Sequence, residues 1–224
     1  MDGRDRARAT FEAHIGKNPY PGRGLVIGRR ADDAGWLLVY FIMGRSENSR
    51  NRRFRHDGDR LWTEAVDESK VADPSLIITD AMLALPGVQL VSNGDQTKTV
   101  FDALAAGDRL PSALATRERE PDAPNYTPRI TGMLDCREDE AHIDLAILKA
   151  NPFDSAHTDR FIYRLAEPPA GFGYGLTTYS GDGNPLPSFA GDPILLPLPG
   201  YFYVRLRHAA PALTRFSFIA LLTV

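Results

Sequence analysis

Short apolar runs separated by turn-forming residues recur along most of this chain, and they constrain its fold more than any other feature. Such runs, rich in β-branched and aromatic side chains and bounded by Gly, Pro, Asn and Asp, are typical of β-strands. Leu25–Gly28 and Trp36–Met43 flank the turn at 32–35, which predicts a hairpin. Further strands are expected at Arg60–Val66, Ser75–Thr79, Val88–Ser92, His142–Ala150, Arg160–Leu165, Tyr174–Tyr179, Tyr201–Arg207 and Arg215–Leu222.

Three segments predict helices. Apolar side chains recur every four residues in Gln96–Ala106, and shorter helices are expected at Pro111–Glu118 and Arg4–His14. Many strands with a helical pair in the middle indicate the α+β class, since α/β proteins alternate strand and helix. The Pro- and Gly-rich stretch Gly181–Gly200 is interpreted as a surface loop, so we expect a single domain over residues 1–224.

The distribution of charge favours a small anionic ligand. Net charge is −3, yet residues 1–60 hold 13 Lys and Arg against 8 Asp and Glu, and most of these cations are Arg. Arginine binds phosphate in a bidentate manner, whereas the overall acidity argues against nucleic acid as the partner. We therefore expect a small phosphorylated molecule as the partner, with no nucleic acid. The sequence leaves the oligomeric state open, a homo-oligomer included.

The cysteine count, the apolar stretches and the absence of known motifs limit the cellular compartment and the redox chemistry that we expect. Cys136 is the single cysteine, so the chain forms no intrachain disulfide. The first residues are polar and the apolar stretch Phe216–Val224 is too short to span a bilayer. We expect a cytoplasmic protein with no membrane partner. The five His residues show no metal-ligand spacing, and no HExxH, CxxC, GxSxG or Walker motif is present, so neither a metal nor a cofactor is expected.

Two loops near the N-terminus carry candidate binding groups. Gly44–Arg53 interleaves several guanidinium groups with Ser and Asn, and such a donor-rich loop suits an anion. The alternative is a solvated hairpin tip. Asn18–Gly24 places Tyr20 and Arg23 at the mouth of the strand that follows, although it also fits a plain strand-leading loop.

Three later segments add polar candidates. In Val91–Thr97, Asp95 is expected to cap the following helix, which leaves Asn93 as the functional candidate of that turn. Glu118–Ile130 crowds carboxylates, an amide and a guanidinium between prolines, as in an active-site loop or a solvated linker. Thr177–Phe189 has the Gly and Pro content of a compact binding loop.

Taken in order, these segments resemble the archaeal-type IMP cyclohydrolase family and its bacterial relatives. The resemblance implies a four-layer αββα fold of the N-terminal-nucleophile-hydrolase type, with two stacked antiparallel sheets. Because Met1-Asp2 offers no terminal nucleophile, it implies that fold without self-processing chemistry. The matching motifs are Pro21-Gly22-Arg23, Arg45-Ser46, Asn51-Arg52, Asp73-Pro74, Val91-Ser92-Asn93-Gly94, Thr127-Pro128-Arg129 and Pro187-Ser188-Phe189.

The family's activity implies a set of site residues. It closes the six-membered ring of a formamido-imidazole carboxamide ribonucleotide with loss of water, which requires no redox cofactor. One departure is Thr79-Asp80, where the family is expected to carry Tyr-Asn. It leaves open a slower enzyme, a cyclase for a modified purine precursor, or a non-catalytic nucleotide-binding protein. We assign Glu120, Arg129 and Asn93 to catalysis, and Arg23, Arg45, Arg52, Asn125 and Thr127 to substrate binding.

Overall fold

Two antiparallel sheets form the body of the protein in the computed structural model, which describes residues 2–71, 78–198 and 218–223. The five-stranded sheet runs in the order β11 (Ile194–Pro197), β10 (Phe172–Thr177), β1 (Arg23–Arg29), β2 (Trp36–Ile42) and β12 (Phe218–Thr223). The seven-stranded sheet follows chain order: β3 (Arg53–Asp57), β4 (Arg60–Glu64), β5 (Asp80–Leu85), β6 (Val88–Ser92), β7 (Arg129–Asp135), β8 (His142–Ala150) and β9 (Thr158–Ala166).

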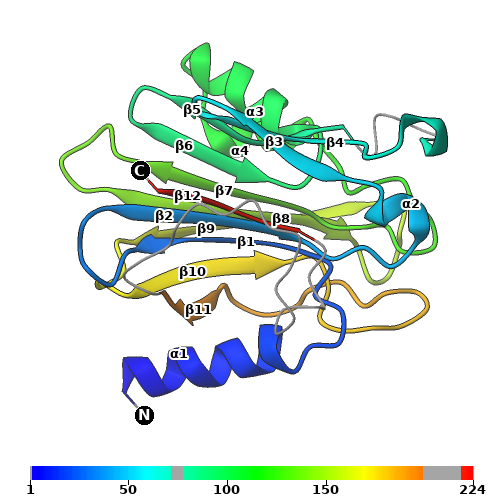
Figure 1. The fold of residues 1–224 in the computed structure, drawn as a ribbon, viewed down its shortest axis with the longest axis horizontal. Helices are drawn as coiled ribbons and strands as arrows, with labels where there is room; N and C mark the ends of the chain where they lie inside the picture. Colours follow the sequence, from blue (N-terminus) through cyan, green and yellow to red (C-terminus); the bar gives the residue numbers. More distant parts are fainter. Residues whose placement is uncertain (1, 72–77, 199–217, 224) are drawn as a thin grey trace.

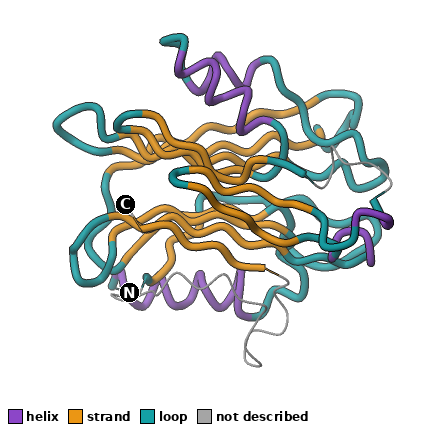
Figure 2. Tube along the Cα trace, turned by 45° about the horizontal axis from the view of Figure 1, so that its top comes forward, coloured by secondary structure: helices purple, strands orange, loops and turns teal. Residues whose placement is uncertain are grey.

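The main hydrophobic core lies between the two sheets, which stack face to face (Figures 1 and 2). Leu25 and Ile27 of β1 are completely buried against side chains of the seven-stranded sheet such as Ile130 of β7. Burying one such aliphatic side chain contributes about 1.5–3 kcal/mol, so this layer supplies most of the apolar stabilisation.

Helices cover the outer face of each sheet (Figure 1). Helix α1 (Gly3–Phe11) continues as a π-helical turn, Glu12–Gly16, and lies against β11. On the opposite side, α3 (Gln96–Ala105) and α4 (Leu110–Ala115) bury apolar side chains on β6, β7 and β8. The layers therefore follow the order helix, sheet, sheet, helices. In the described part of the chain, no helix has the length and apolar character needed to cross a membrane.

The α+β class and the two antiparallel sheets expected from the sequence are confirmed, while kinship with N-terminal-nucleophile hydrolases and the single-domain boundary stay predictions. β6 and β8 have the predicted bounds. The prediction missed β3, β5, β7 and β11 as strands. The strand expected at Ser75–Thr79 lies mostly outside the described residues, as does all of Tyr201–Arg207, and β5 begins only at Asp80. Two shorter helical turns, α2 (Glu47–Arg50) and Glu68–Lys70, complete the described elements.

Candidate functional site

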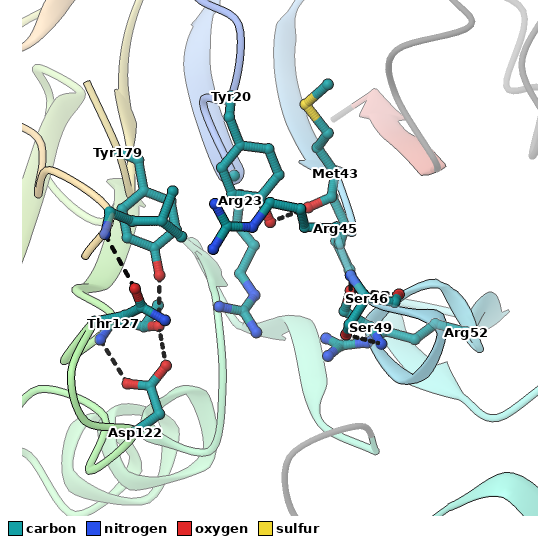
Figure 3. Close-up of a pocket in the computed structure, with 14 residues that line it drawn as sticks. Tyr20, Arg23, Met43, Arg45, Ser46, Ser49, Arg52, Asp122, Thr127 and Tyr179 are labelled. Atoms are coloured by element: carbon teal, nitrogen blue, oxygen red, sulfur yellow. Dashed lines mark hydrogen bonds between the residues drawn. The ribbon is translucent and has the colours of Figure 1, made fainter. Parts of the chain in front are cut away.

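A pocket of about 370 Å³ opens where loops from both sheets meet, and its volume suits a small organic ligand (Figure 3). The loop before β1 and the loop after β2 form one wall, and the segment before β7 and the end of β10 form the other. Its lining residues are Tyr20, Gly22, Arg23, Ile42, Met43, Arg45, Ser46, Ser49, Arg52, Asp122, Asn125, Thr127, Tyr179 and Leu186.

Two hydrogen bonds between the Arg23 backbone and Thr178 hold this residue at the start of β1. Its N–H donates to Thr178 Oγ1 at 3.0 Å, and its carbonyl accepts from the Thr178 N–H at 2.9 Å. Gly22, at φ +72°, permits this close approach, because a Cβ there would lie 2.3 Å from the Thr178 hydroxyl. The Arg23 Nη1 atom lies 3.7 Å from Glu120 Oε1. Burial lowers the pKa of Arg23, but the Glu120 carboxylate and the phenols of Tyr40, Tyr179 and Tyr20 together raise it above its ordinary value, so the guanidinium stays charged.

Arg52 is a buried cation with an unsatisfied donor. Only 7% of the residue is exposed, and its Nε has no hydrogen-bond partner. Burial, and then the charge of Arg23, lower the pKa of Arg52 to about 10. A buried unpaired charge is costly, and such a group is stabilised by an anion or a strongly polar oxygen. The inner pocket is thus built to receive an acceptor.

Glu120 places a carboxylate between these cations and the turn after β6. The residue is 8% exposed, and burial raises the pKa of its carboxyl while Arg23 opposes the rise. Its backbone N–H donates to the Thr127 carbonyl at 3.0 Å. The Asp122 carboxylate accepts from the Thr127 N–H at 2.6 Å, which closes the 120–127 segment into a compact loop. A desolvated carboxyl of this kind suits general acid–base catalysis.

Three phenols surround the cations, and the sequence prediction assigned none of them a role. Burial raises the pKa of Tyr40 and that of Tyr179 to about 12, so both are neutral hydrogen-bonding groups at neutral pH. Tyr20 stacks on Tyr179 with ring centroids 5.7 Å apart, and its hydroxyl donates to the Met43 carbonyl at 3.0 Å. A hydroxyl-rich strand end, Thr177 to Ser180, was the available signal for Tyr179.

Two of the predicted binding residues lie at the pocket mouth with partners already in place. Arg45 Nη1 donates to Asp182 Oδ1 at 2.8 Å and to the Gly183 carbonyl at 2.9 Å. Its guanidinium lies over the Tyr20 ring, 5.5 Å from the centroid. Asn125 Oδ1 accepts from the Leu186 N–H at 3.0 Å, which ties two loops of the wall together.

Asn93 and Arg129 lie beside the pocket and do not line it. Asn93 is fully buried: its amide donates to the Pro128 carbonyl at 3.0 Å and its oxygen accepts from the Ile130 N–H. Arg129 donates to the Glu118 carbonyl at 2.7 Å and pairs with Asp95. Both side chains hold the loops around Glu120 in place, so we assign them positioning roles in place of the direct contacts first assigned.

Asp95 occupies the N-cap position of α3, as expected from the sequence, but it does not cap the helix through its side chain. Its side chain makes no capping hydrogen bond; the carboxylate pairs with Arg117 and Arg129 instead. Two arginines outcompete the backbone amides because each offers a charge-assisted contact.

Thr79 and Asp80, where the chain departs from the expected Tyr-Asn, are also outside the pocket lining. The Thr79 carbonyl accepts from the Thr63 N–H at 3.0 Å, and Asp80 accepts from Arg60 at 2.7 Å. Both serve the edge where β4 meets β5.

The fold and the pocket together define an α+β protein of two stacked antiparallel sheets, with a pocket at one end lined by arginine side chains, phenols and hydroxyl groups. The chain belongs to the IMP cyclohydrolase-like protein family, whose family model matches residues 20–194. That span contains all eight site residues predicted from the sequence, and the resemblance to the family is confirmed. No curated protein sequence matches the chain.

Proposed function

We propose that this protein is a cyclohydrolase that closes the ring of 5-formamido-imidazole-4-carboxamide ribonucleotide to give IMP and water. The observation that carries the proposal is a buried cluster in a chain from this family: Arg23 and Arg52 line the pocket, and the Glu120 carboxylate lies behind them, 3.7 Å from Arg23. Two guanidinium groups against one carboxylate leave a net positive charge, which favours a phosphorylated ligand with polarisable carbonyl oxygens.

Binding would use cations at two depths. Arg52 and Arg23 would hold oxygens of the base or the phosphate deep in the pocket. Arg45 would reach the ligand at the mouth on leaving Asp182, because an exposed ion pair is worth only about 0–1 kcal/mol and exchanges readily. Fixing the rotamer that brings the two reacting groups of one molecule together lowers much of the barrier.

A single carboxylate can carry out every proton transfer that the ring closure requires. The carboxamide nitrogen attacks the formyl carbon, forming the C–N bond as the carbonyl electron pair moves to oxygen. Glu120 takes a proton from the nitrogen and returns one to that oxygen, giving the carbinolamine. The C–O bond then breaks: Glu120, again a carboxylate, takes the proton of the former formamide nitrogen and delivers it to the leaving hydroxide, which departs as water while the C=N bond forms. Arg23 and Arg52 would stabilise the developing oxyanion.

Replacing Glu120 by Gln separates this chemistry from binding. Turnover of the formylated ribonucleotide should fall by roughly 100-fold or more, the usual contribution of a general acid–base group, while IMP affinity stays near that of the wild type. Steady-state kinetics with direct IMP titration measures both. Undiminished turnover in Glu120→Gln would remove the residue from the mechanism.

The ligand class has its own test. IMP at 100 times its dissociation constant should stabilise the fold by about 2.7 kcal/mol, and inosine, which lacks the phosphate, should do so much less. Equal thermal stabilisation by the two ligands would contradict phosphate binding.

One observation favours a second candidate, a nucleotide-binding protein without turnover or a cyclase for a modified purine precursor. The phenol expected from the family is replaced by Thr79, whose backbone N–H donates to the Thr63 hydroxyl at 3.2 Å. Under this alternative IMP binds as described above, and the formylated substrate is not converted.

A further inference from the structure

A chain of hydrogen bonds leads from a carboxylate to a phenol on the pocket wall (Figure 3). The Thr127 hydroxyl donates to Asp122 Oδ2, and the same hydroxyl oxygen lies 2.6 Å from the Tyr179 hydroxyl. All three side chains line the pocket. Thr127 is 2% exposed and Tyr179 is 4% exposed, so bulk water does not compete for these bonds.

The carboxylate sets the direction of this chain. An ionised carboxylate only accepts, and a threonine hydroxyl has a single proton to give. Since Thr127 spends that proton on Asp122, the hydrogen bond between Thr127 and Tyr179 must be donated by the phenol. The Tyr179 oxygen therefore presents only lone pairs to a ligand, as a hydrogen-bond acceptor.

The same region holds the carboxylate that the proposed reaction needs. The charges of Arg23 and Glu120 both act on the Tyr179 phenol, and Arg23 lies 3.7 Å from Glu120. Two acceptors, the Tyr179 oxygen and the Glu120 carboxylate, are thus both within electrostatic reach of the Arg23 guanidinium. A primary carboxamide has two N–H groups; ring closure removes one and keeps the other.

We propose that the Tyr179 oxygen accepts a hydrogen bond from the N–H that the attacking carboxamide nitrogen keeps, while Glu120 takes the other proton. This inference rests on the proposed function. Asp122 and Thr127 are positioning residues, which orient the phenol as an acceptor. In the product the retained N–H is the one on N1 of the purine ring, so the same contact selects for a protonated N1.

Two neutral-base nucleotides test this selection without turnover. IMP has an N1–H, whereas purine riboside 5′-monophosphate has a lone pair at N1 and no N–H on its six-membered ring. The wild type should bind IMP more tightly. Tyr179→Phe should lower that preference by about tenfold, the effect of losing one ordinary hydrogen bond. Thr127→Val should lower it further, because the freed phenol proton can then be donated to the N1 lone pair.

Conservative variants separate selection from structure. Thr127→Ser keeps the hydroxyl and should keep the preference. Tyr20→Phe is the matched control, since it removes the hydroxyl of another phenol that lines the pocket, one that donates to the Met43 carbonyl, and it should leave the preference unchanged. Isothermal titration with both ligands gives each ratio, and a thermal melt of each variant reports folding. Should Thr127→Val fail to fold, Tyr179→Phe alone decides.

The outcomes separate this inference from the proposed function. An unchanged preference in Tyr179→Phe, or equal weakening of both ligands in Tyr179→Phe and Thr127→Val, would overturn the acceptor role. A wild type that shows the preference but converts no substrate would overturn the proposed cyclohydrolase activity and leave the acceptor role standing. A wild type that binds neither nucleotide would overturn both.

Discussion

Replacing Arg52 by Met should stabilise the ligand-free protein and weaken its binding of IMP at the same time. Most substitutions of a buried side chain destabilise a fold, so this sign is diagnostic. It follows from the environment of Arg52, which is 93% buried, has a free Nε and is close enough to Arg23 for the two charges to repel.

The magnitude can be worked from the pKa. Lowering the pKa of Arg52 from its ordinary 12.5 to about 10 corresponds to about 3 kcal/mol of unfavourable interaction in the charged form. Methionine keeps the apolar stem and removes the charge, so we expect a gain of about 1–3 kcal/mol after packing losses. For a chain of this length, each kcal/mol raises the Tm by about 2–4 °C. Loss of a charge-assisted contact should cost about 1.5–3 kcal/mol of IMP affinity, roughly 10- to 150-fold.

Thermal denaturation with and without saturating IMP measures both effects in one experiment. Arg45→Met is the control, because Arg45 is half-exposed and paired with Asp182, so its loss should not raise the Tm of the free protein. A lower Tm for ligand-free Arg52→Met, or an IMP-induced shift as large as that of the wild type, would refute the buried-cation argument.

Three further predictions concern the surroundings of the site. Gly94→Ala should destabilise the fold by about 1–3 kcal/mol in chemical denaturation, because Gly94 has φ +114° and an added Cβ would lie 2.9 Å from Gln96 Oε1 and 3.0 Å from Arg129 Nη1. An unchanged denaturation midpoint would contradict the tight turn. The affinity for IMP should fall as the pH rises through about 10, since the Arg52 guanidinium is charged below its pKa and neutral above it. An affinity that stays constant up to about pH 11 would exclude a role of the Arg52 charge in binding. Thr79→Tyr should change turnover by less than about threefold, because Thr79 does not line the pocket, and a larger gain would restore a role for the family's phenol.

The loops that line the candidate site were predicted more accurately from the sequence than the strands of the seven-stranded sheet. Val88–Ser92 and His142–Ala150 are apolar runs with clear ends, and their bounds were right. β5 was misplaced because the ends of the strand Asp80–Leu85 are determined by its pairing with β6 across the Pro86-Gly87 turn. Such pairing between strands does not show in the local sequence pattern. That Pro-Gly pair was the signal available for the hairpin.

The chemistry of single residues depended on partners that the sequence does not reveal. Arg23, Arg52 and Glu120 were picked as polar candidates, and the fold brings them together from three separate segments: both arginines line the pocket, and Glu120 lies 3.7 Å from Arg23. Asn93 was expected to act in catalysis, as the functional candidate of the sharp turn before α3. Its donors and acceptors are instead used by the backbone of the strand beside it, at Pro128 and Ile130. Only a three-dimensional hydrogen-bond inventory separates these two roles.

The central claim is ring closure, and ultraviolet absorbance tests it most directly. Purified wild-type protein is mixed with 5-formamido-imidazole-4-carboxamide ribonucleotide, and the appearance of the purine chromophore is followed against Glu120→Gln and a protein-free control. We expect catalysed formation of IMP by the wild type and strongly reduced formation by the variant. Absorbance that rises no faster with the wild type than without protein, in a preparation that still binds IMP, would contradict the enzyme and leave a nucleotide-binding protein.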